Sequence, residues 1–445
     1  MDNEELKQRA IEAIDREVGR LAEVGWDIFR HPELGFKERR TAGVVAREFG
    51  RLGLGFHEEL ALTGVKATVQ GRGGPGPNIA IIGELDSVLV AAHPDADPHP
   101  GAAPCCGHNA QITTMLGVAT GLVSSGVLDE LAGSVTFFAV PAEEYVELEE
   151  RLGLREQGKT EFLGGKSELV RLGAFDDVDM AMMVHAGAFE DGTICSLNDS
   201  CNGFVGKQAR FIGKAAHAGG APHDGINALY AANLALEAIN AQRETYQDGD
   251  SVRIHPILTR GGDLVNVIPN DVRLETMIRG KTLDAIVDAD RKVDRALKAG
   301  ALAMGAQVEI TSLPGYLPLR NDAGLSAVFK ENLLRHFPES AWEDAGHGSW
   351  STDLGDLSAI MPVIEPNMAG FAGTVHGSDW RIIDDELAYI WPAKLMSSAV
   401  IDLLANGASR ATQIVDDYDA GMTLDEYVAF MRRASRAETF SGFAG

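Results

Sequence analysis

Short apolar runs alternate with longer segments of helical length over the first 202 residues of the chain. The runs lie at 67–69, 79–82, 135–140 and 180–184, and one of the intervening segments is 113–125. Strands that alternate with helices favour a mostly parallel sheet covered by helices on both faces. Because open α/β sheets bind their ligands beyond the carboxyl ends of the strands, we expect reactive residues directly after these runs.

The pattern changes near Gly203. Strands are predicted at 206–213, 251–258, 270–278 and 307–311, and helices at 226–241 and 283–299. This order, strand-helix-strand-strand-helix-strand, is that of a ferredoxin-like unit. The fold class that we expect is α/β, with a catalytic domain of residues 1–202 and 314–445 and a ferredoxin-like α+β domain inserted at 203–313. The tail after about Ala405 suggests no particular function, although a helix is predicted at 424–436.

Charge and composition exclude several kinds of partner. Asp and Glu outnumber Lys and Arg by 65 to 39, which gives a formal net charge of −26. Because nucleic-acid binding depends on Lys and Arg that neutralise phosphates, no nucleic-acid partner is expected, and an anionic membrane surface is disfavoured too. No run approaches the ~20 apolar residues of a membrane span. We expect a cytoplasmic protein whose four cysteines are thiols or metal ligands.

Two short blocks follow predicted strands or loops and carry the groups that bind metals. The first is Cys-Cys-Gly-His-Asn at 105–109, and the second is Pro-Ala-Glu-Glu at 141–144, at the end of an apolar run. A thiolate, an imidazole and adjacent carboxylates are ligands of catalytic zinc or manganese sites. These blocks therefore predict a metal-dependent hydrolase.

Several blocks together resemble one known family. They are HPELGF at 31–36, CCGHN at 105–109, PAEE at 141–144, VH at 184–185, AAHAGGAPHDGINAL at 215–229, GGDLVNVIPN at 261–270, STDLGD at 351–356 and TVH at 374–376. In this order and spacing they resemble the dimetal aminoacylase and carboxypeptidase family. The branch that they resemble most is that of p-aminobenzoyl-glutamate hydrolase and its amidohydrolase relatives, with 5-nitroanthranilate aminohydrolase as the alternative closer resemblance.

The resemblance implies a centre of two divalent metal ions, zinc or manganese. Its ligands would be Cys106, His108, Glu144, His185 and His376. Two ions about 3.5–4 Å apart can share and activate one water molecule. The resemblance assigns the remaining carboxylate of the PAEE block, Glu143, to general-base catalysis.

Other residues are expected to support this centre. Asp86, at the end of an apolar run, would orient a ligand imidazole by accepting its second ring proton. In the family pattern the inserted domain is a lid and dimerisation domain, and its His217 reaches the partner's active site to stabilise the oxyanion. Asn266 and Arg279 would bind polar groups or a carboxylate of the substrate. The resemblance thus implies a homodimer or a multiple of it.

Two segments depart from the family pattern. Residues 88–104 are longer than the turn that usually joins the motifs on either side, and residues 145–162 form an added charged segment. Both adjoin the predicted metal ligands. The sequence therefore leaves the natural substrate open.

Three functions remain open at this stage. The first is hydrolysis of the C–N bond of a small N-acyl or aryl amide. The second keeps the site but releases ammonia from an electron-poor aromatic amine such as a nitroanthranilate. The third is a non-catalytic binding protein on the same fold, which the retention of every expected ligand and of Glu143 disfavours.

Overall fold

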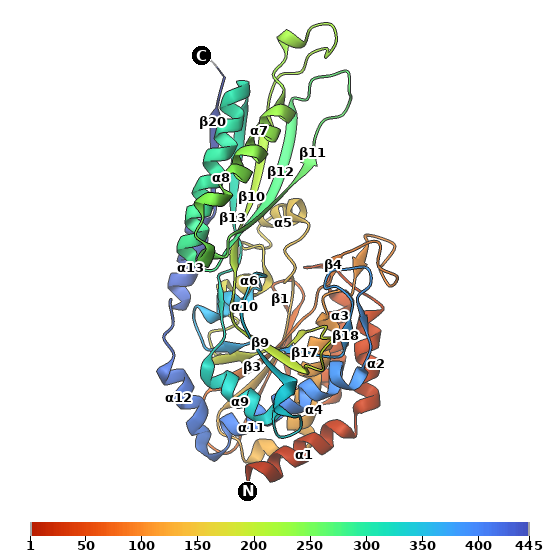
Figure 1. Ribbon diagram of the computed structural model, residues 1–445. Helices are drawn as coiled ribbons and strands as arrows, with labels where there is room; N and C mark the ends of the chain where they lie inside the picture. Colours follow the sequence, from red (N-terminus) through yellow and green to blue (C-terminus); the bar gives the residue numbers. More distant parts are fainter. Residues whose placement is uncertain (1, 444–445) are drawn as a thin grey trace. The chain divides into compact units, whose positions relative to one another are not determined.

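The computed structural model (Figure 1) describes residues 2–443, which divide into two compact units. Unit 1 comprises the chain up to Asp199 together with Arg320–His347 and Asp356–Leu424. Unit 2 comprises Ser200–Leu319, Gly348–Gly355 and the chain from Asp425 onward. The expected α/β fold with an inserted second domain is confirmed.

The central sheet of unit 1 has six strands in the order β1-β2-β6-β3-β7-β16. These strands are β1 (Phe56–Leu60), β2 (Gly64–Gln70), β3 (Asn78–Glu84), β6 (Ser134–Val140), β7 (Met180–Met182) and β16 (Val363–Ile364). Strands β6, β3, β7 and β16 run parallel to one another. At one edge of the sheet β2 pairs antiparallel with β6, and β1 pairs antiparallel with β2. Every residue of β3 is buried, as in a central parallel strand covered on both faces.

Helices pack on this sheet and on one another. They are α1 (Asn3–Asp15), α2 (Val18–Phe29), α3 (Arg39–Arg51), α4 (His108–Ser124), α5 (Leu148–Glu156), α6 (Gly165–Arg171), α9 (Ala323–Leu333), α11 (Trp391–Leu404) and α12 (Ser409–Asp417). Helix α4 packs on β3 and β6, and α1, α2 and α11 pack against α4. On the opposite face of β6, the ring of Phe138 lies 5.0 Å from that of Phe175.

Smaller strands complete unit 1. A second sheet has the order β14-β9-β17-β8, with β15 paired to β9. Its strands are β14 (Leu319–Arg320), β9 (Cys195–Cys201), β17 (Asn367–Met368), β8 (His185–Ala186) and β15 (Trp342–Gly348), and the short helix α10 (Leu354–Ser358) follows β15. Two short hairpins are β4 (Val88–Leu89) with β5 (Ala102–Ala103) and β18 (Phe371–Ala372) with β19 (Arg381–Ile382).

We expected no run to approach the length of a membrane span, but one helical stretch among the described residues, Glu386–Leu404, is long and apolar enough to cross a membrane by length and composition alone. In the structure 83% of it is buried. Its burial is that of a core helix, and it belongs to the same apolar cluster as α4.

Unit 2 contains the predicted ferredoxin-like order, which is confirmed. Its elements are β10 (Gly203–Ile212), α7 (Ala228–Ala241), β11 (Arg253–Arg260), β12 (Asp271–Gly280), α8 (Leu283–Met304) and β13 (Gln307–Pro314). Alternate residues of β12 are buried, so one face of this antiparallel sheet carries the core, and α7 and α8 both pack on β10 and β12. Thr282 is the N-cap of α8, and its side-chain oxygen accepts a hydrogen bond from the N–H of Ala285. Gly305, in the left-handed backbone conformation, is the C-cap of the helix.

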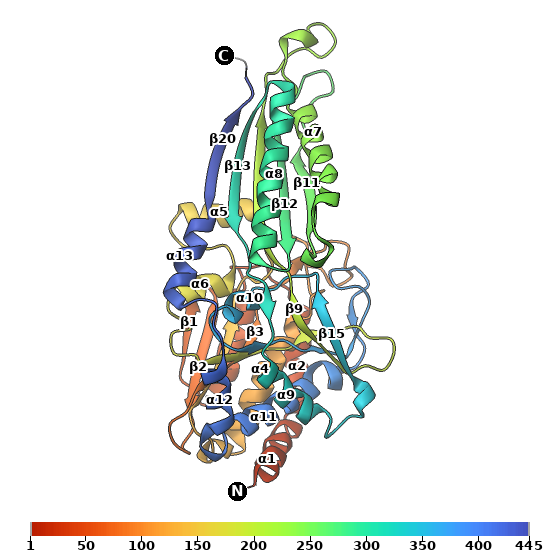
Figure 2. The same cartoon turned by 60° about the vertical axis from the view of Figure 1, so that its left-hand side comes forward.

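The expected domain limits differ from the observed ones at the C-terminus. We expected all of 314–445 in the catalytic domain, but helix α13 (Leu424–Ala434) leads into β20 (Arg436–Ser441), which lies beside β13 in unit 2 (Figure 2). The two strands pair antiparallel, from Gln307 with Ser441 to Ser312 with Arg436. Local sequence patterns do not show which strand a segment pairs with, because pairing is a long-range contact.

The tail also completes a cluster of charges in unit 2. Lys207 is fully buried and its ammonium lies 2.7 Å from Asp290, and it also contacts Asp294. The guanidinium of Arg436 contacts the same two carboxylates and lies 2.5 Å from that of Asp294. Two cations thus neutralise two carboxylates, whereas Lys207 alone would leave one negative charge uncompensated.

We expect Arg436→Met to destabilise unit 2 by about 1–2 kcal/mol, because the ion pair between a partly exposed guanidinium and two buried carboxylates is lost. Calorimetric unfolding measures the change. Arg433→Met is the matched control, since Arg433 is exposed and lies on the same tail. An equal loss of stability in the control would contradict the role of the charge cluster.

Candidate metal centre

The candidate centre lies where three neighbouring strands of unit 1 end. Glu84 is the last residue of β3, the PAEE block follows β6, and His185 follows β7 by three residues. Because β6, β3 and β7 are adjacent and parallel, their carboxyl ends meet at one edge of the sheet. The parallel sheet therefore brings together side chains that are far apart in the sequence.

Cys106 and His108 come to the same edge from the start of α4. Gly107, between them, has φ 91°, and a Cβ atom there would lie 2.3 Å from the Cβ of Ala186. Only glycine fits a left-handed backbone with this close contact. The turn at Gly107 lets a thiol and an imidazole two residues apart point into one cluster.

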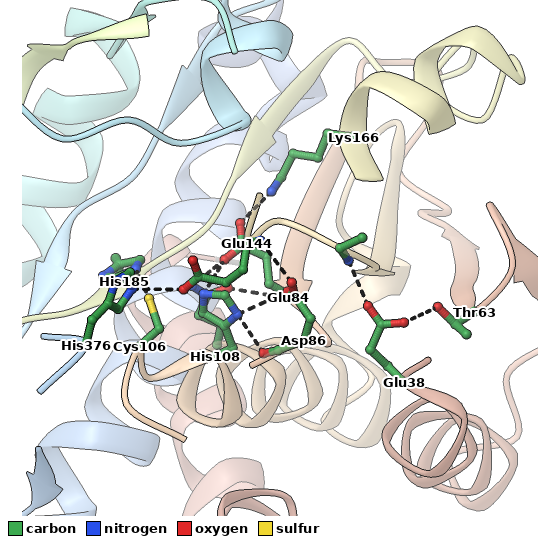
Figure 3. Close-up of polar contacts among 12 residues, drawn as sticks. Glu38, Thr63, Glu84, Asp86, Cys106, His108, Glu144, Lys166, His185 and His376 are labelled. Atoms are coloured by element: carbon green, nitrogen blue, oxygen red, sulfur yellow. Dashed lines mark hydrogen bonds and ion pairs between the residues drawn. The ribbon is translucent and has the colours of Figure 1, made fainter. Parts of the chain in front are cut away.

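The five predicted ligands lie together (Figure 3) and form two overlapping groups. Donor atoms of Cys106, His108 and His185 lie within 4.8 Å of one another, and so do those of Cys106, Glu144 and His376. The Sγ atom of Cys106 is 3.4 Å from Nε2 of His185, and Nε2 of His376 is 2.9 Å from Oε1 of Glu144. Cys106 belongs to both groups.

Glu143 faces the same cluster. One of its oxygens lies within 4.8 Å of donor atoms of Glu84 and His108, and its side chain is buried. Its predicted role as a base thus agrees with its position beside the candidate ligands.

Two of the imidazoles are held by hydrogen bonds at Nδ1, the ring nitrogen that is not the proposed metal ligand. Nδ1 of His108 is 2.8 Å from the backbone oxygen of Asp86 and 3.3 Å from its carboxylate, and Nδ1 of His185 is 3.2 Å from the carbonyl of Ala186. A ring that donates Nδ1–H to a carbonyl presents the lone pair of Nε2 to a metal. The other carboxylate oxygen of Asp86 accepts from the N–H of Glu144 at 2.9 Å. Asp86 therefore contacts two of the predicted ligands.

The electrostatics of the cluster fit a bound cation. Burial alone would raise the pKa of Glu144, but the imidazole of His376, 2.9 Å away, outweighs burial and lowers this pKa to about 2. Burial likewise opposes the charged form of His108, yet Glu84 and Asp86 raise its pKa to about 10. Burial and the charges of Glu144 and Glu143 raise the pKa of the Cys106 thiol well above its usual value. A divalent cation would reverse this last effect and hold the thiolate.

Two buried atoms of the cluster, Nε2 of His108 and Oε1 of Glu144, have no hydrogen bond of good geometry. Each is a ligand atom that a metal would use. A thiolate, three imidazoles and a carboxylate suit zinc, and the oxygen and nitrogen donors also admit manganese. The donor set therefore fits the two divalent ions that the sequence predicted.

Sequence reasoning missed Glu84 and its partner Lys166. Both side chains are fully buried, and Nζ of Lys166 lies 2.5 Å from Oε1 of Glu84. Oε2 of Glu84 accepts from Gln111 at 2.9 Å and lies 3.1 Å from Nε2 of His108. Burial opposes the charge on Glu84, but Lys166 and His108 lower its pKa below the usual value. A carboxylate that ends an otherwise apolar strand was the signal available in the sequence.

The unusual segment 88–104 packs against the loop that carries His376. His93, within it, is buried, and its Nδ1 accepts the N–H of Asp95 at 3.1 Å. Its Nε2–H donates to the carbonyl of Trp380 at 2.8 Å. Trp380 in turn stacks on Phe371, with ring centroids 5.2 Å apart. The hairpin β4–β5 thereby anchors the far end of the His376 loop.

The three remaining predicted residues belong to unit 2, whereas the cluster belongs to unit 1. His217 is exposed, and its Nδ1 accepts the N–H groups of Gly219 and Gly220 at 3.2 and 2.9 Å, so the neutral ring carries its proton on Nε2. Asn266 is also exposed. Arg279 donates to Oγ of Ser351 at 2.8 Å and lies over the ring of Phe204. Their roles toward substrate remain predictions.

Comparisons with known proteins agree with this geometry. Residues 201–304 match the peptidase dimerisation domain. The chain is 29% identical over 377 residues to Xaa-Arg dipeptidase of Mus musculus, with 81% of this chain and 79% of that protein covered. It is 28% identical over 335 residues to one of the p-aminobenzoyl-glutamate hydrolase subunits of Escherichia coli (strain K12), with 64% and 71% covered.

A solved structure shows the same fold. It is that of a dinuclear metal-binding peptidase of the M20 family from Bacillus subtilis, with a TM-score of 0.65 and 21% sequence identity, and the match covers 88% of this chain and 99% of that one. The predicted resemblance is confirmed by these matches, which extend over both units. The chain is thus similar to amidohydrolases and to a dinuclear metal-binding peptidase of the M20 family, and its residues 201–304 match a peptidase dimerisation domain.

Proposed function

We propose that this protein is a metal-dependent amidohydrolase that cleaves the C–N bond of a small N-acyl or aryl amide. One observation carries the proposal: two groups of metal-binding side chains share Cys106 and lie beside the buried carboxylate of Glu143. Cys106, His108, Glu144, His185 and His376 would hold two zinc or manganese ions. Such ions, when bound, lower the pKa of water and polarise a carbonyl group.

The residues of the chain divide the proton transfers between them. Glu143 takes a proton from the attacking water and returns it to the departing nitrogen. It is our candidate because the resemblance assigns its neighbour Glu144 to a metal and gives the carboxylate of Glu143 no ligand role. His217 offers Nε2–H, because its Nδ1 is occupied by two backbone donors. An N–H donor suits the negative charge that develops on the carbonyl oxygen during attack.

The substrate class is inferred from the relatives and from charge. The two curated relatives described above are named for a dipeptide and for p-aminobenzoyl-glutamate, each of which has a C–N bond beside a carboxylate. The chain itself is strongly negative, so a carboxylate substrate needs local positive charge. Arg279 and Asn266 are our candidates for that contact, because a guanidinium binds a carboxylate with two parallel hydrogen bonds.

A second copy of the chain is the partner that we propose. Strand β11 is the edge of the unit 2 sheet opposite β20, and it exposes Ile257 and Leu258, while the following loop exposes Leu264 and Val265. An unpaired edge strand with exposed apolar side chains favours pairing with another chain. The four cysteines are buried thiols, which agrees with the reducing cytoplasm that we propose as its location.

We expect Glu143→Gln to lower kcat by about 10²–10⁴-fold, because an amide cannot accept the proton that a general base takes. Metal content measured by mass spectrometry should stay at the wild-type value. Glu144→Gln is the matched neighbour, and it should lose metal. Unchanged turnover in Glu143→Gln would favour the non-catalytic binding protein instead.

Metal removal tests the centre directly. Dialysis against a chelator should abolish activity, and zinc, manganese or cobalt should restore it when added back, because the ligands fit borderline cations. A panel of N-acyl amino acids, aminobenzoyl conjugates and nitroaryl amines, with assays for free amine and for ammonia, separates amide hydrolysis from the aminohydrolase alternative. Full activity in metal-free protein would contradict the proposal.

Mixed dimers test whether His217 acts on the partner's site. His217→Ala and Glu143→Gln homodimers should both be nearly inactive. After protomer exchange, a mixed dimer has one complete site if His217 acts across the interface, so about a quarter of wild-type activity should return. No recovery, with exchange verified by native mass spectrometry, would show that His217 acts within its own protomer, and a fully active His217→Ala homodimer would show that it has no catalytic role.

A further inference from the structure

The added segment 145–162 buries an arginine beside the candidate centre. Helix α5 carries Arg151, whose side chain is only 2% exposed. Arginine is almost never buried to this extent unless its donors are satisfied. The partners of Arg151 therefore indicate what the segment does.

Three backbone carbonyls accept hydrogen bonds from this guanidinium. They belong to Leu163, at 2.6 Å, to Ala142, at 3.3 Å, and to Glu144. The rings of Phe36 and Tyr145 lie 5.3 and 5.9 Å from the guanidinium carbon. Arg151 thus contacts the backbone on both sides of Glu143.

The turn that Arg151 contacts is strained. Ala142 has φ 55°, in the left-handed region that alanine rarely adopts, and it directly precedes Glu143 and Glu144. From the opposite side Glu38, which is fully buried, accepts the N–H of Ala142 at 2.8 Å and the hydroxyl of Thr63 at 2.6 Å (Figure 3). The turn is therefore held between a cation on its carbonyls and a carboxylate on its N–H.

The close fit gives the glycine of the HPELGF block, Gly35, a physical reason. A Cβ atom at Gly35 would lie 2.4 Å from Nη2 of Arg151 and 2.9 Å from the Cα of Ala142. Any larger residue would displace the arginine or the turn. Gly35 leaves room for Arg151 to reach Ala142 and Glu144.

We propose that Arg151 is a positioning residue, which holds the Ala142–Glu144 turn so that Glu143 and Glu144 keep their places at the metal centre. Arginine suits this role because its planar fork donates to several carbonyls at once, whereas lysine is a point donor. The inference rests on the proposed function, since it assigns the added segment to the support of the catalytic base and of one metal ligand.

The test compares Arg151→Lys and Arg151→Met with the matched control Arg155→Met, which removes a partly exposed arginine from the same helix. Each protein is loaded with cobalt, and its metal affinity, visible absorption spectrum, kcat, KM and thermal unfolding are measured. Glu38→Gln, on the other side of the turn, covers the case in which Arg151→Met fails to fold.

We expect both Arg151 variants to lose about 10–100-fold in kcat or in metal affinity, with KM nearly unchanged and an altered cobalt spectrum. The control should match wild type in all of these. A merely structural role would lower the unfolding temperature and leave the spectrum and kcat as they are, and that result in Arg151→Lys would overturn the proposal. If wild type hydrolyses no amide, the cobalt affinity and spectrum still decide the inference, so its failure is distinct from failure of the proposed function.

Discussion

The accumulation of buried acidic groups at one edge of a parallel sheet is the constraint on which the rest of unit 1 depends. Glu84, Asp86, Glu143 and Glu144 all lie at the ends of β3 and β6, and all four are buried. Like charges so close together and away from water cannot all remain ionised without cations nearby. Lys166 supplies one positive charge, and divalent ions between Cys106 and the histidines would supply the others.

Backbone hydrogen bonds hold the loops around this centre. The N–H of Glu144 donates to Asp86, and the N–H of His376, whose φ is 61°, donates to the carbonyl of Cys105 at 2.8 Å. The two segments that depart from the family pattern add to this support, one through His93 and the other through Arg151. Hydrogen bonds to the segments that carry the ligands fix the orientation of the ligand side chains. This orientation affects the metal affinity and the direction in which the carboxylate of Glu143 points. Because both segments, 88–104 and 145–162, lie near the candidate centre, a role in substrate selection is compatible with their positions.

Local patterns predicted much of the fold. The apolar runs at 79–82 and 135–140 became β3 and β6, and the strand-helix-strand-strand-helix-strand order of the inserted unit is the observed one. Those patterns depend on side-chain periodicity within a few residues, which the sequence displays directly. The grouping of the five candidate ligands was implied by the resemblance to the dimetal family, and the adjacent parallel strands β6, β3 and β7 explain why Glu144 and His185 converge.

Other features could not be predicted, since they depend on contacts between distant segments. Nothing near Lys166 indicates that it pairs with Glu84, which lies 82 residues earlier, and nothing near Arg151 indicates the carbonyls that it meets. The strand β20 was missed for the same reason, because an exposed edge strand carries no apolar alternation strong enough to distinguish it from a helix end. Whether a charged side chain can be buried depends on the group that it pairs with, and the fold determines which group lies nearby.

The position of β20 has a consequence for assembly. A ferredoxin-like sheet has two edges, and two open edges permit head-to-tail pairing of successive molecules, which does not close. Among the described residues of unit 2, β20 covers β13 and becomes one edge of the sheet, and β11 is the other edge. Strand β20 carries the exposed charges of Arg436 and Glu438, whereas β11 exposes Ile257 and Leu258, so pairing of β11 with the same strand of a second copy is favoured and would give a closed twofold dimer. In the dimer that we propose, the tail therefore contributes to specificity of assembly as well as to the charge balance around Lys207.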